Sequence, residues 1–345
     1  MKQELVTDGA LMLYRNSSKK ADSRRESSKK AFENEEMPSE RQEEWRYTYI
    51  QKFKLDSFAP FDGVSGISVN IPKESQDGGV VICDMNSAFE KHPSIVDQYL
   101  GKSIRESNKI IFLNDAFWSN GVFVYVPDNT TMEEPIRLNF KISQKSTASR
   151  NLIIVGKNCR LNIVEEWDDG TRDETFNSSV TEVFVGDGSK VSYGHLNDLG
   201  KGANSFNYIV GTLEKDSSID WNAASFGGNL NRLRIDTIFN GPGSNANNLG
   251  VFLSKGKEHI DFTTNAYHLV PNTTNDIKAD GILKDSSTCV YRGLIKIDRS
   301  TVHKFLLIRP SSEDGGKIAG KQHTCLGDRC QRSQGIPWSD DGSSG

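Results

Sequence analysis

The most acidic stretch of the sequence has the residue types for calcium binding or for acid–base catalysis. Four of the five residues from Glu165 to Asp169 are carboxylates, and Asp173 and Glu174 follow. Calcium prefers several carboxylate and carbonyl oxygens, and glycoside hydrolases act with two carboxyl groups placed across the bond that breaks. Because the stretch lies between strand-like segments, we expect a solvated loop and no site there.

Two cysteines and a histidine near the end of the chain, Cys325, Cys330 and His323, could suggest a zinc site. The Cys-x4-Cys spacing is loose and no second pair of ligands follows, whereas structural zinc sites usually have four ligands. We therefore assign no metal site. The other cysteines are isolated in the sequence, and we expect small buried residues at Cys83, Cys159 and Cys289.

Two histidines, His259 and His268, flank the polar run Asp261–Asn265. They could form a polar surface for a partner, but we favour histidines that hold turns by hydrogen bonds. The Gly241-Pro242-Gly243 segment is followed by neither Lys-Ser nor Lys-Thr, so we expect no phosphate-binding loop and no ATP hydrolysis. The sequence thus offers no catalytic, cofactor-binding or metal-binding residue, and we expect a protein that is not an enzyme.

Composition limits the class of protein. The 345 residues carry 42 Lys and Arg against 46 Asp and Glu, a formal net charge of −4, which argues against nucleic-acid binding. No run of apolar residues is long enough for a membrane span. Residues 1–8 lack the apolar core of a signal peptide, and five cysteines without dense spacing fit the reducing cytosol. We therefore expect a cytoplasmic protein.

The elements that must position any site begin with a polar region. Residues 1–48 carry both charges in near balance, which predicts a solvated helical segment. Residues 49–120 predict an α/β cap with one helix, Ser87–Leu100, and with Gly101 just past its C-terminal end.

From Gly121 to about Ile297, apolar and polar residues alternate in short runs, which is the period-two pattern of strands with one buried face. Turn residues follow a hydrophobic residue at regular intervals, at Val126, Val155, Val185, Leu213 and Phe239. The intervals are 29, 30, 28 and 26 residues, and the next such turn, after Leu283, comes 44 residues later, so one unit is irregular. A period of this length indicates a solenoid, in which stacked two-strand units bury one another's apolar faces. A β-sandwich gives similar alternation and is the alternative.

Several segments carry a resemblance to one known family: Met37–Thr48, Leu113–Phe117, Gly121–Pro127, Pro135–Ile136, His259–Asp276, Gly281–Leu283 and Val290–Ile297. In this order and at these intervals they resemble the SufB/SufD family of iron–sulfur cluster assembly scaffolds, and SufD more closely than SufB, over residues 26–300. Asp280 departs from the pattern, because relatives often carry lysine there. The resemblance implies a mainly β fold, a right-handed parallel β-helix over residues 121–300 with helical N- and C-terminal parts.

The resemblance also implies a function, that of a non-catalytic scaffold subunit in the SUF iron–sulfur cluster assembly complex. Such a subunit pairs with SufB through the β-helix ends, the ATPase SufC binds C-terminal helices, and a transient cluster assembles at the SufB–SufD junction. No cofactor is expected on this chain alone, and the sulfur-accepting cysteine motif of SufB is missing. We expect the exposed edge of the last coil, with Val290, Arg292 and Leu294, to pair with the SufB-like subunit. A homodimer is the alternative assembly.

The rival function is that of a polysaccharide lyase or hydrolase built on the same β-helix. Such an enzyme needs a carbohydrate groove with clustered carboxylates and often calcium. These enzymes are usually secreted, and the lack of a signal peptide argues against this class. A structural β-solenoid without any role in cluster assembly is a third alternative.

From about Thr301 the sequence departs from the family, and we expect residues 301–345 to form an irregular, disordered tail. Gly, Ser and Asp become frequent there, and the SufC-docking helices and a His-Gly segment of the relatives are missing. Codons for Thr301–Trp338 can be chosen so that the frame one nucleotide later spells a SufD-like segment. This predicts that the tail is a frameshift product, which the nucleotide sequence tests. An uncapped final coil would then promote self-association.

Overall fold

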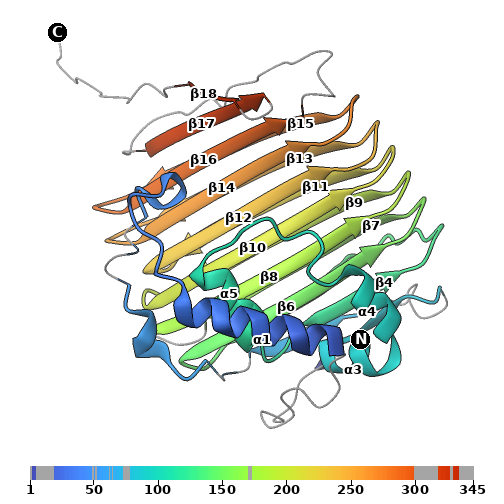
Figure 1. Ribbon diagram of the computed structural model, residues 1–345, viewed down its shortest axis with the longest axis horizontal. Coiled ribbons are helices and arrows are strands. Elements are labelled where there is room, and N and C mark those ends of the chain that lie inside the picture. Colours follow the sequence, from blue (N-terminus) through green and yellow to red (C-terminus); the bar gives the residue numbers. More distant parts are fainter. Residues whose placement is uncertain are drawn as a thin grey trace.

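The computed structural model describes residues 2–4, 19–48, 50, 53–61, 63, 65–72, 78–169, 173–298, 318–326 and 329–333, the first range and the last two by their backbone only. Two sheets of long strands face each other, and the helices pack on one side of them (Figure 1). None of the helices in these ranges combines the length and the apolar character needed to cross a bilayer.

Short helices and strands precede the solenoid. In chain order they are β1 (Lys2–Glu4), α1 (Lys19–Asn34), η1 (Glu43–Trp45), η3 (Leu55–Phe58), β2 (Gly66–Asn70), β3 (Val81–Asp84), α3 (Met85–Lys91), α4 (Pro93–Tyr99) and α5 (Lys109–Phe117). The predicted single helix Ser87–Leu100 is wrong, because Pro93 has no amide hydrogen to continue α3 and instead opens α4. Gly101, with a φ of +76°, does follow the last turn as predicted.

Helix α5 is a second difference from the sequence prediction. One helix was expected in residues 49–120, and the segment Leu113–Phe117, which carries part of the family resemblance, is the C-terminal half of this further helix. Asn108 caps its N-terminus, since the Asn108 side chain accepts hydrogen bonds from the amides of Ile110 and Ile111 at 2.9 and 3.1 Å. The β domain therefore begins only at β4.

Strands β4 to β16 form the solenoid. Their bounds are β4 (Val122–Val126), β5 (Ile136–Ile142), β6 (Ser146–Val155), β7 (Arg160–Asp169), β8 (Thr175–Val185), β9 (Lys190–Leu199), β10 (Ala203–Leu213), β11 (Ser218–Gly227), β12 (Leu230–Phe239), β13 (Asn245–Ser254), β14 (His259–His268), β15 (Thr274–Leu283) and β16 (Thr288–Ile297). The odd-numbered strands form sheet A and the even-numbered strands form sheet B. Every neighbouring pair among them is parallel. The parallel β-solenoid is thus confirmed, and the sandwich is excluded.

Antiparallel strands flank the solenoid at its beginning: β2 pairs with β5, and β3 pairs with β4. At the other end, the backbone of β17 (Ile318–Leu326) pairs in parallel with β16, and β18 (Arg329–Ser333) pairs antiparallel with β17. The remainder of residues 301–345 lies outside the described residues, so the predicted tail and its frameshift origin stay predictions.

The coil length is regular throughout, which corrects the irregular unit expected from sequence. Strand β12 pairs with β14 so that Phe239 lies beside His268, an offset of 29 residues. The turn that continues the series therefore follows His268. A polar histidine stands there in place of the hydrophobic residue that precedes the other turns. Leu283 ends β15 in the other sheet and belongs to the other row of turns.

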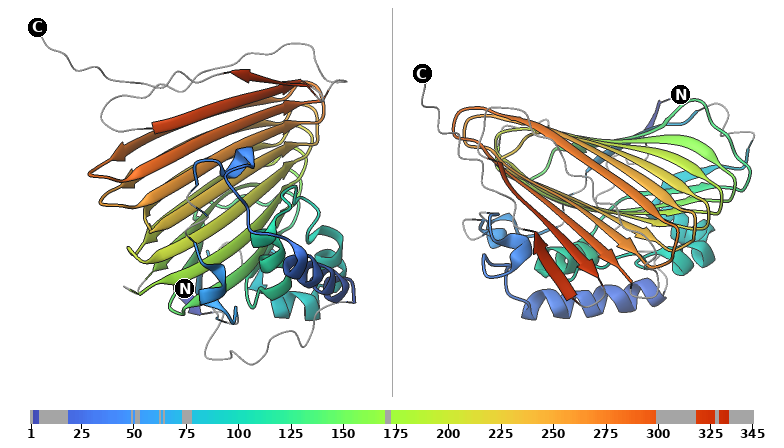
Figure 2. Two further views of the ribbon diagram at one scale, coloured as in Figure 1. Left: turned by 60° about the vertical axis from the view of Figure 1, so that its left-hand side comes forward. Right: turned by 90° about the horizontal axis from the view of Figure 1, so that it is seen from above.

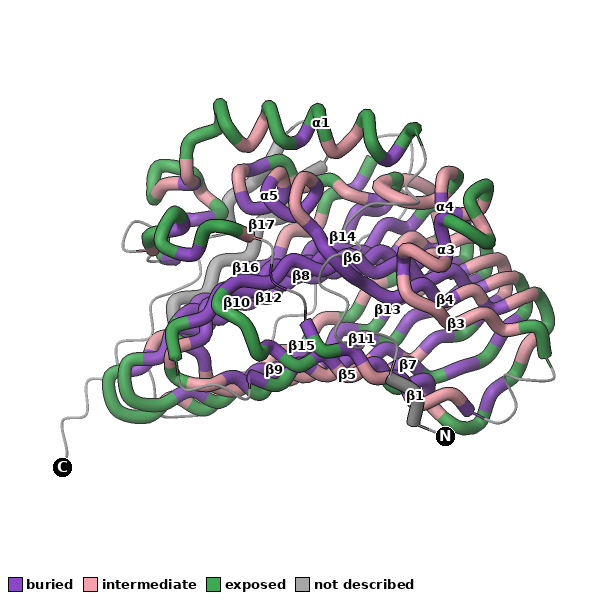
Figure 3. Tube along the Cα trace, turned by 90° about the horizontal axis from the view of Figure 1, so that it is seen from below, coloured by how far each residue is buried: buried purple, intermediate pink, exposed green. Residues whose placement is uncertain are grey.

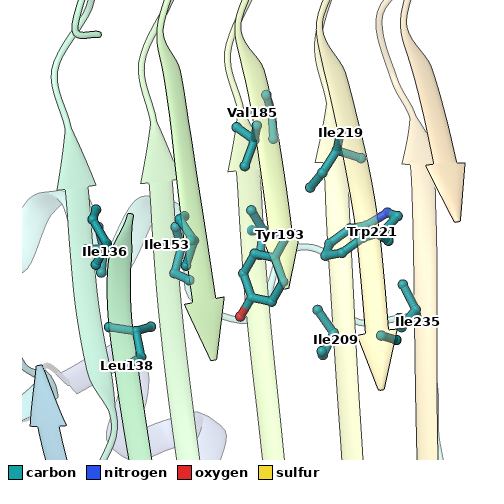
Figure 4. Packing of buried hydrophobic residues seen from close by; sticks show 14 of the residues in the cluster. Ile136, Leu138, Ile153, Val185, Tyr193, Ile209, Ile219, Trp221 and Ile235 are labelled. Carbon is teal, nitrogen blue, oxygen red and sulfur yellow. The ribbon is translucent and has the colours of Figure 1, made fainter. Parts of the chain in front are cut away.

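Side chains inside the solenoid stack in rows along the coils. On sheet A, the rings of Phe140 and Trp167 stack with centroids 4.2 Å apart, and those of Tyr193 and Trp221 lie 5.2 Å apart. Branched side chains of both sheets, among them Ile209 and Ile219, lie around Tyr193 and Trp221 (Figure 4). This interdigitated apolar half of the interior is the main core of the molecule.

The other half of the interior is polar. Asn177 donates a hydrogen bond to Asn207 at 3.2 Å, Asn207 donates to Asn197 at 2.9 Å, and Asn197 donates to Asn231 at 3.0 Å. All four side chains are buried. These amides link neighbouring coils and the two sheets, and each buried amide satisfies the next.

Helices cover the outer face of sheet B, and Figure 3 shows them on the side of the solenoid opposite to sheet A. Arg150 on β6 anchors them, since its guanidinium lies 2.6 Å from Asp115 of α5 and 3.0 Å from Glu182 of β8. Asp115 also lies 2.7 Å from Arg24 of α1. Both faces of sheet B are therefore buried, and its strands β6, β12 and β14 are buried along their whole length.

Replacing Trp221 with alanine should remove a large, fully buried ring from the apolar interior. We expect a loss of about 3–5 kcal/mol in the free energy of unfolding, from lost burial and the remaining cavity. Urea titration followed by circular dichroism measures it. The control Asn222→Ala, on the exposed face of the same strand, should change stability by less than about 0.5 kcal/mol. Equal effects of both variants would contradict the assignment of the core.

Candidate partner-binding end of the solenoid

Strand β15 is the last strand of sheet A in the described part of the chain, and it pairs only with β13. The amides of Thr274 and Lys284 donate to carbonyls on the β13 side. Successive backbone amides of a strand point to alternate sides. The backbone amides and carbonyls of the even-numbered residues of β15 therefore point to β13, and those of the odd-numbered residues point to the open edge. A row of amides and carbonyls is thus presented at the end of sheet A (Figure 2).

The core next to this edge is only partly covered. Ile277 and Ala279 point inward from β15 and pack on the main core, yet both stay half-buried. A strand added to β15 would cover them as β15 itself covers the preceding coil. Apolar surface and unpaired backbone groups therefore occur together at this end.

A buried ion cluster lies beside the same end, on the outer face of sheet B. Asp261 of β14 contacts Arg232 of β12, and the guanidinium of Arg292 on β16 donates to Asp261 at 2.6 Å. Thr48 donates its hydroxyl to Asp261 and accepts from Arg292 at 3.3 Å. Trp45 lies over Arg232, with 3.8 Å between the guanidinium carbon and the ring centroid. The N-terminal region is thereby attached to three successive coils.

The charges in this cluster determine the state of Asp261. Burial alone would raise the pKa of its carboxyl, but Arg232 and Arg292 outweigh burial and lower that pKa to about 2. The carboxylate is therefore ionised at neutral pH and fully surrounded by donors.

The predicted interface residues lie on this outer face rather than on a free surface. Val290 and Arg292 are buried, and Leu294 is half-buried. These side chains are therefore not free for contact: Thr48 accepts a hydrogen bond from Arg292 at 3.3 Å, and Leu294 packs against the cluster that includes Ile111. That the edge pairs with a partner stays a prediction. In the described residues β17 pairs with the edge of β16, whereas β15 ends sheet A.

Comparison of the sequence with known proteins identifies its family. The family model for the SufBD core domain of the SUF system for Fe–S cluster assembly matches residues 139–303, and the model for the SufBD N-terminal region matches residues 66–138. The chain belongs to the SufB/SufD family. The match ends close to the point where the sequence departs from the family, and it leaves the segment Met37–Thr48 uncovered.

Curated relatives in the SufB/SufD family are distant. The chain is 27% identical over 237 residues to an iron–sulfur cluster assembly SufBD family protein of Staphylococcus saprophyticus, covering 67% of this chain and 50% of that one. It is 27% identical to SufB of Bacillus subtilis (67% and 50% covered) and 26% identical to SufD of the same organism (67% and 54%). The chain therefore spans about half the length of these relatives and is equally similar to both kinds of subunit.

The two histidines singled out from sequence make local hydrogen bonds. His268 bonds through Nδ1 to Thr273 in the turn before β15 at 2.7 Å and stacks on Phe239 at 4.4 Å. His259 bonds to Thr288 at the start of β16 at 2.6 Å. Burial lowers the pKa of both rings, to about 4 for His268. The interpretation as histidines that hold turns is therefore confirmed for His268, whereas His259 links two adjacent strands.

The acidic stretch Glu165–Asp169 is not a loop, which corrects the sequence prediction. It forms the second half of β7, so its carboxylates alternate between the two faces of sheet A. Glu165 points inside and accepts from the indole of Trp167 at 2.6 Å, whereas Glu166 points out and pairs with Arg137 at 3.1 Å. Adjacent carboxylates of this stretch therefore point to opposite faces, and of the two that share the outer face, Glu166 and Asp168, the first is already paired with Arg137.

The cysteines offer little chemistry. Cys159 and Cys289 are buried, as predicted, and Cys83 is half-buried. Burial raises the pKa of the Cys83 thiol to about 11 and that of Cys289 well above its ordinary value. Within the described ranges no group of three His, Cys, Asp or Glu side chains is close enough to hold a metal. Cys325, Cys330 and His323 are described by their backbone only, so the sequence assignment of no metal site there stays a prediction.

The ion cluster around Asp261 was missed from sequence. One signal was present, since Arg232, Arg234 and Asp236 alternate along β12 and give that strand a charged face, although all three are buried. Thr48 gave no signal, because its contacts come from residues 184 to 244 positions away.

Asp261→Asn should leave two buried arginines without their shared anion. We expect a loss of about 3–5 kcal/mol in the free energy of unfolding near neutral pH. Since the pKa of Asp261 in the fold is about 2, below the ordinary value of 3.8, its carboxylate stabilises the fold above about pH 4 and loses this effect toward pH 2. Urea unfolding across this range should show the difference between variant and parent shrinking in acid.

The matched control is Asp276→Asn, an exposed carboxylate on β15. It should stay within about 0.5 kcal/mol of the parent at every pH. A difference for Asp261→Asn that did not change with pH would contradict the ionised state of this carboxylate.

Proposed function

We propose that the chain is a non-catalytic, SufD-like scaffold subunit of a cytoplasmic SUF iron–sulfur cluster assembly complex. It pairs with a SufB-like subunit, and a SufC-like ATPase joins the same complex. The observation that carries this proposal is the open end of a SufB/SufD-family solenoid, where β15 presents unpaired backbone beside half-buried Ile277 and Ala279. A family member with such an end is suited to extending its sheet into that of a second family member.

The three thiols in the described part of the chain, those of Cys83, Cys159 and Cys289, support a SufD-like rather than a SufB-like role. A sulfur-accepting cysteine acts as a thiolate, which needs an accessible sulfur and a low pKa. Cys159 and Cys289 are buried, and the pKa values of Cys83 and Cys289 are raised. We therefore assign sulfur acceptance to the partner.

The iron–sulfur cluster is cargo in this proposal. It would be assembled transiently at the junction of the two solenoids, with its ligands completed by the SufB-like subunit. The ion cluster around Asp261 ties β16 to β14 in sheet B, in the coils that include β15. An edge whose neighbouring strands are already held in place loses less conformational entropy on pairing.

Co-expression with a SufB-like and a SufC-like protein tests the proposal. We expect a stable complex on size-exclusion chromatography that carries labile iron and sulfide, with none on this chain alone. Failure to co-purify with either protein would contradict the proposal. Calcium-dependent release of unsaturated oligosaccharides by the chain would support the polysaccharide lyase instead.

Ala279→Pro tests the edge itself. Residue 279 directs its amide away from β13, so proline removes a donor of the open edge without breaking the ladder to β13. We expect affinity for the SufB-like subunit to fall at least about tenfold in sedimentation or calorimetry, with the melting temperature of the isolated chain within about 4 °C of the parent. Lys278→Ala, on the exposed outer face of the same strand, is the control and should bind as the parent does. Unchanged affinity of the proline variant would exclude β15 as the pairing edge.

A further inference from the structure

An apolar patch lies on the outer face of sheet A. Four side chains in it, Leu249, Val251, Leu253 and Ile282, are 43%, 40%, 36% and 59% exposed. In the described part of the chain, only Tyr47 is a further large hydrophobic residue with comparable exposure. Such residues are common singly on protein surfaces, but a contiguous group is not.

The strand register places these side chains together. Val251 lies beside Ala224 of β11, and Leu253 lies between Phe226 of β11 and Ile282 of β15. With Leu249 they form the β13 patch, which consists of Ala224, Phe226, Leu249, Val251, Leu253 and Ile282. At ~4.8 Å between strands and ~3.3 Å per residue, it spans about 10 by 13 Å between Cα atoms.

The patch differs from the rest of the same face. The outward residues of β7 include Arg160, Asn162, Glu166 and Asp168, which is the polar pattern of a solvated sheet. On β13 the outward positions after Asn247 are all apolar. The change in pattern is therefore local to the last strands of sheet A.

Acidic residues surround the patch. Asp198 lies beside Phe226, Asp220 and Asp276 lie on either side of Asn247, and Asp280 lies beside Val251. The nearest cation, Lys278, is 3.6 Å from Asp280 and offsets only that charge. Lys255 and Lys284 follow Leu253 and Ile282 at one end of the patch. The negative charge of the rim therefore lies at Asp198, Asp220 and Asp276, which no ion pair neutralises within the described ranges.

We infer that the β13 patch is a docking site for a basic amphipathic helix of a partner protein. The backbone of β13 is already paired with β11 and β15, so a partner gains affinity from side chains and not from an added strand. A helix of about 10 residues is ~15 Å long and ~10 Å wide, which matches the patch. Lysines and arginines flanking its apolar stripe would meet the four rim carboxylates.

The charge of the rim also separates this occupant from a second copy of the chain. Two copies packed face to face would bring their carboxylates together, and this like-charge contact disfavours the dimer. Helices of this chain already pack on the outer face of sheet B (Figure 3), which is a precedent in the same molecule for a helix on the outer face of a sheet.

The test is fluorescence anisotropy with a labelled 18-residue helical peptide that carries leucines at i, i+3, i+4 and i+7 and lysines on both flanks. Val251→Lys/Leu253→Lys should weaken binding at least about tenfold, because it removes apolar contact and repels the peptide. The control Asn162→Lys/Val164→Lys adds the same charge to outward positions of β7 and should bind within about twofold of the parent. A peptide with glutamates in place of the lysines should bind at least about tenfold more weakly.

Equal weakening by both variants would overturn the proposal, because the peptide would then recognise only the overall charge. Equal affinity for the lysine and glutamate peptides, or no binding of the lysine peptide, would overturn it too. So would a dimer in analytical ultracentrifugation that Val251→Lys/Leu253→Lys dissociates, since the patch would then be an interface between two copies. None of these outcomes depends on whether a partner strand pairs with the edge of β15. They therefore test the patch independently of the proposed function.

Discussion

The parallel pairing of each strand with the strand one coil earlier is the constraint on which the rest of the structure depends. No strand between β4 and β16 pairs with the next strand along the chain, so each coil is held by its neighbours and not by itself. This pairing aligns equivalent residues into rows, such as Tyr193 beside Trp221, and the rows build the core. It also leaves the last strand of sheet A with unpaired groups. The proposed interface is therefore a direct result of how the fold is stabilised.

The alternation of residues and the spacing of turns indicated a solenoid but left a β-sandwich open, and the family resemblance favoured the β-helix that the structure shows. Local patterns also determined which side chains share a face, but not what covers that face. Arg292 points outward, as alternation requires, and is nevertheless buried, because Thr48 and its neighbours fold back over it from more than 200 residues away. A contact of that sequence separation leaves no local periodicity to detect.

Other differences have equally specific causes. The helix expected from Ser87 to Leu100 divides because a proline at position 93 outweighs the helical pattern around it. The charge of Glu165–Asp169 predicted a loop, but the segment is a strand. The interior of this solenoid has a polar half, in which Glu165 accepts a hydrogen bond from Trp167. In an ordinary β domain that carboxylate would be excluded from the core.

The amide chain through Asn177, Asn207, Asn197 and Asn231 has a consequence for how such a protein changes in evolution. A single-residue insertion within a strand would turn these amides outward and separate them from their partners. Removing or duplicating an entire coil would leave each amide with an equivalent partner in the coil that becomes its neighbour. Homologous chains should therefore differ in length by complete repeats or by residues in the turns, and ancestral duplication is the simplest origin for so regular an array.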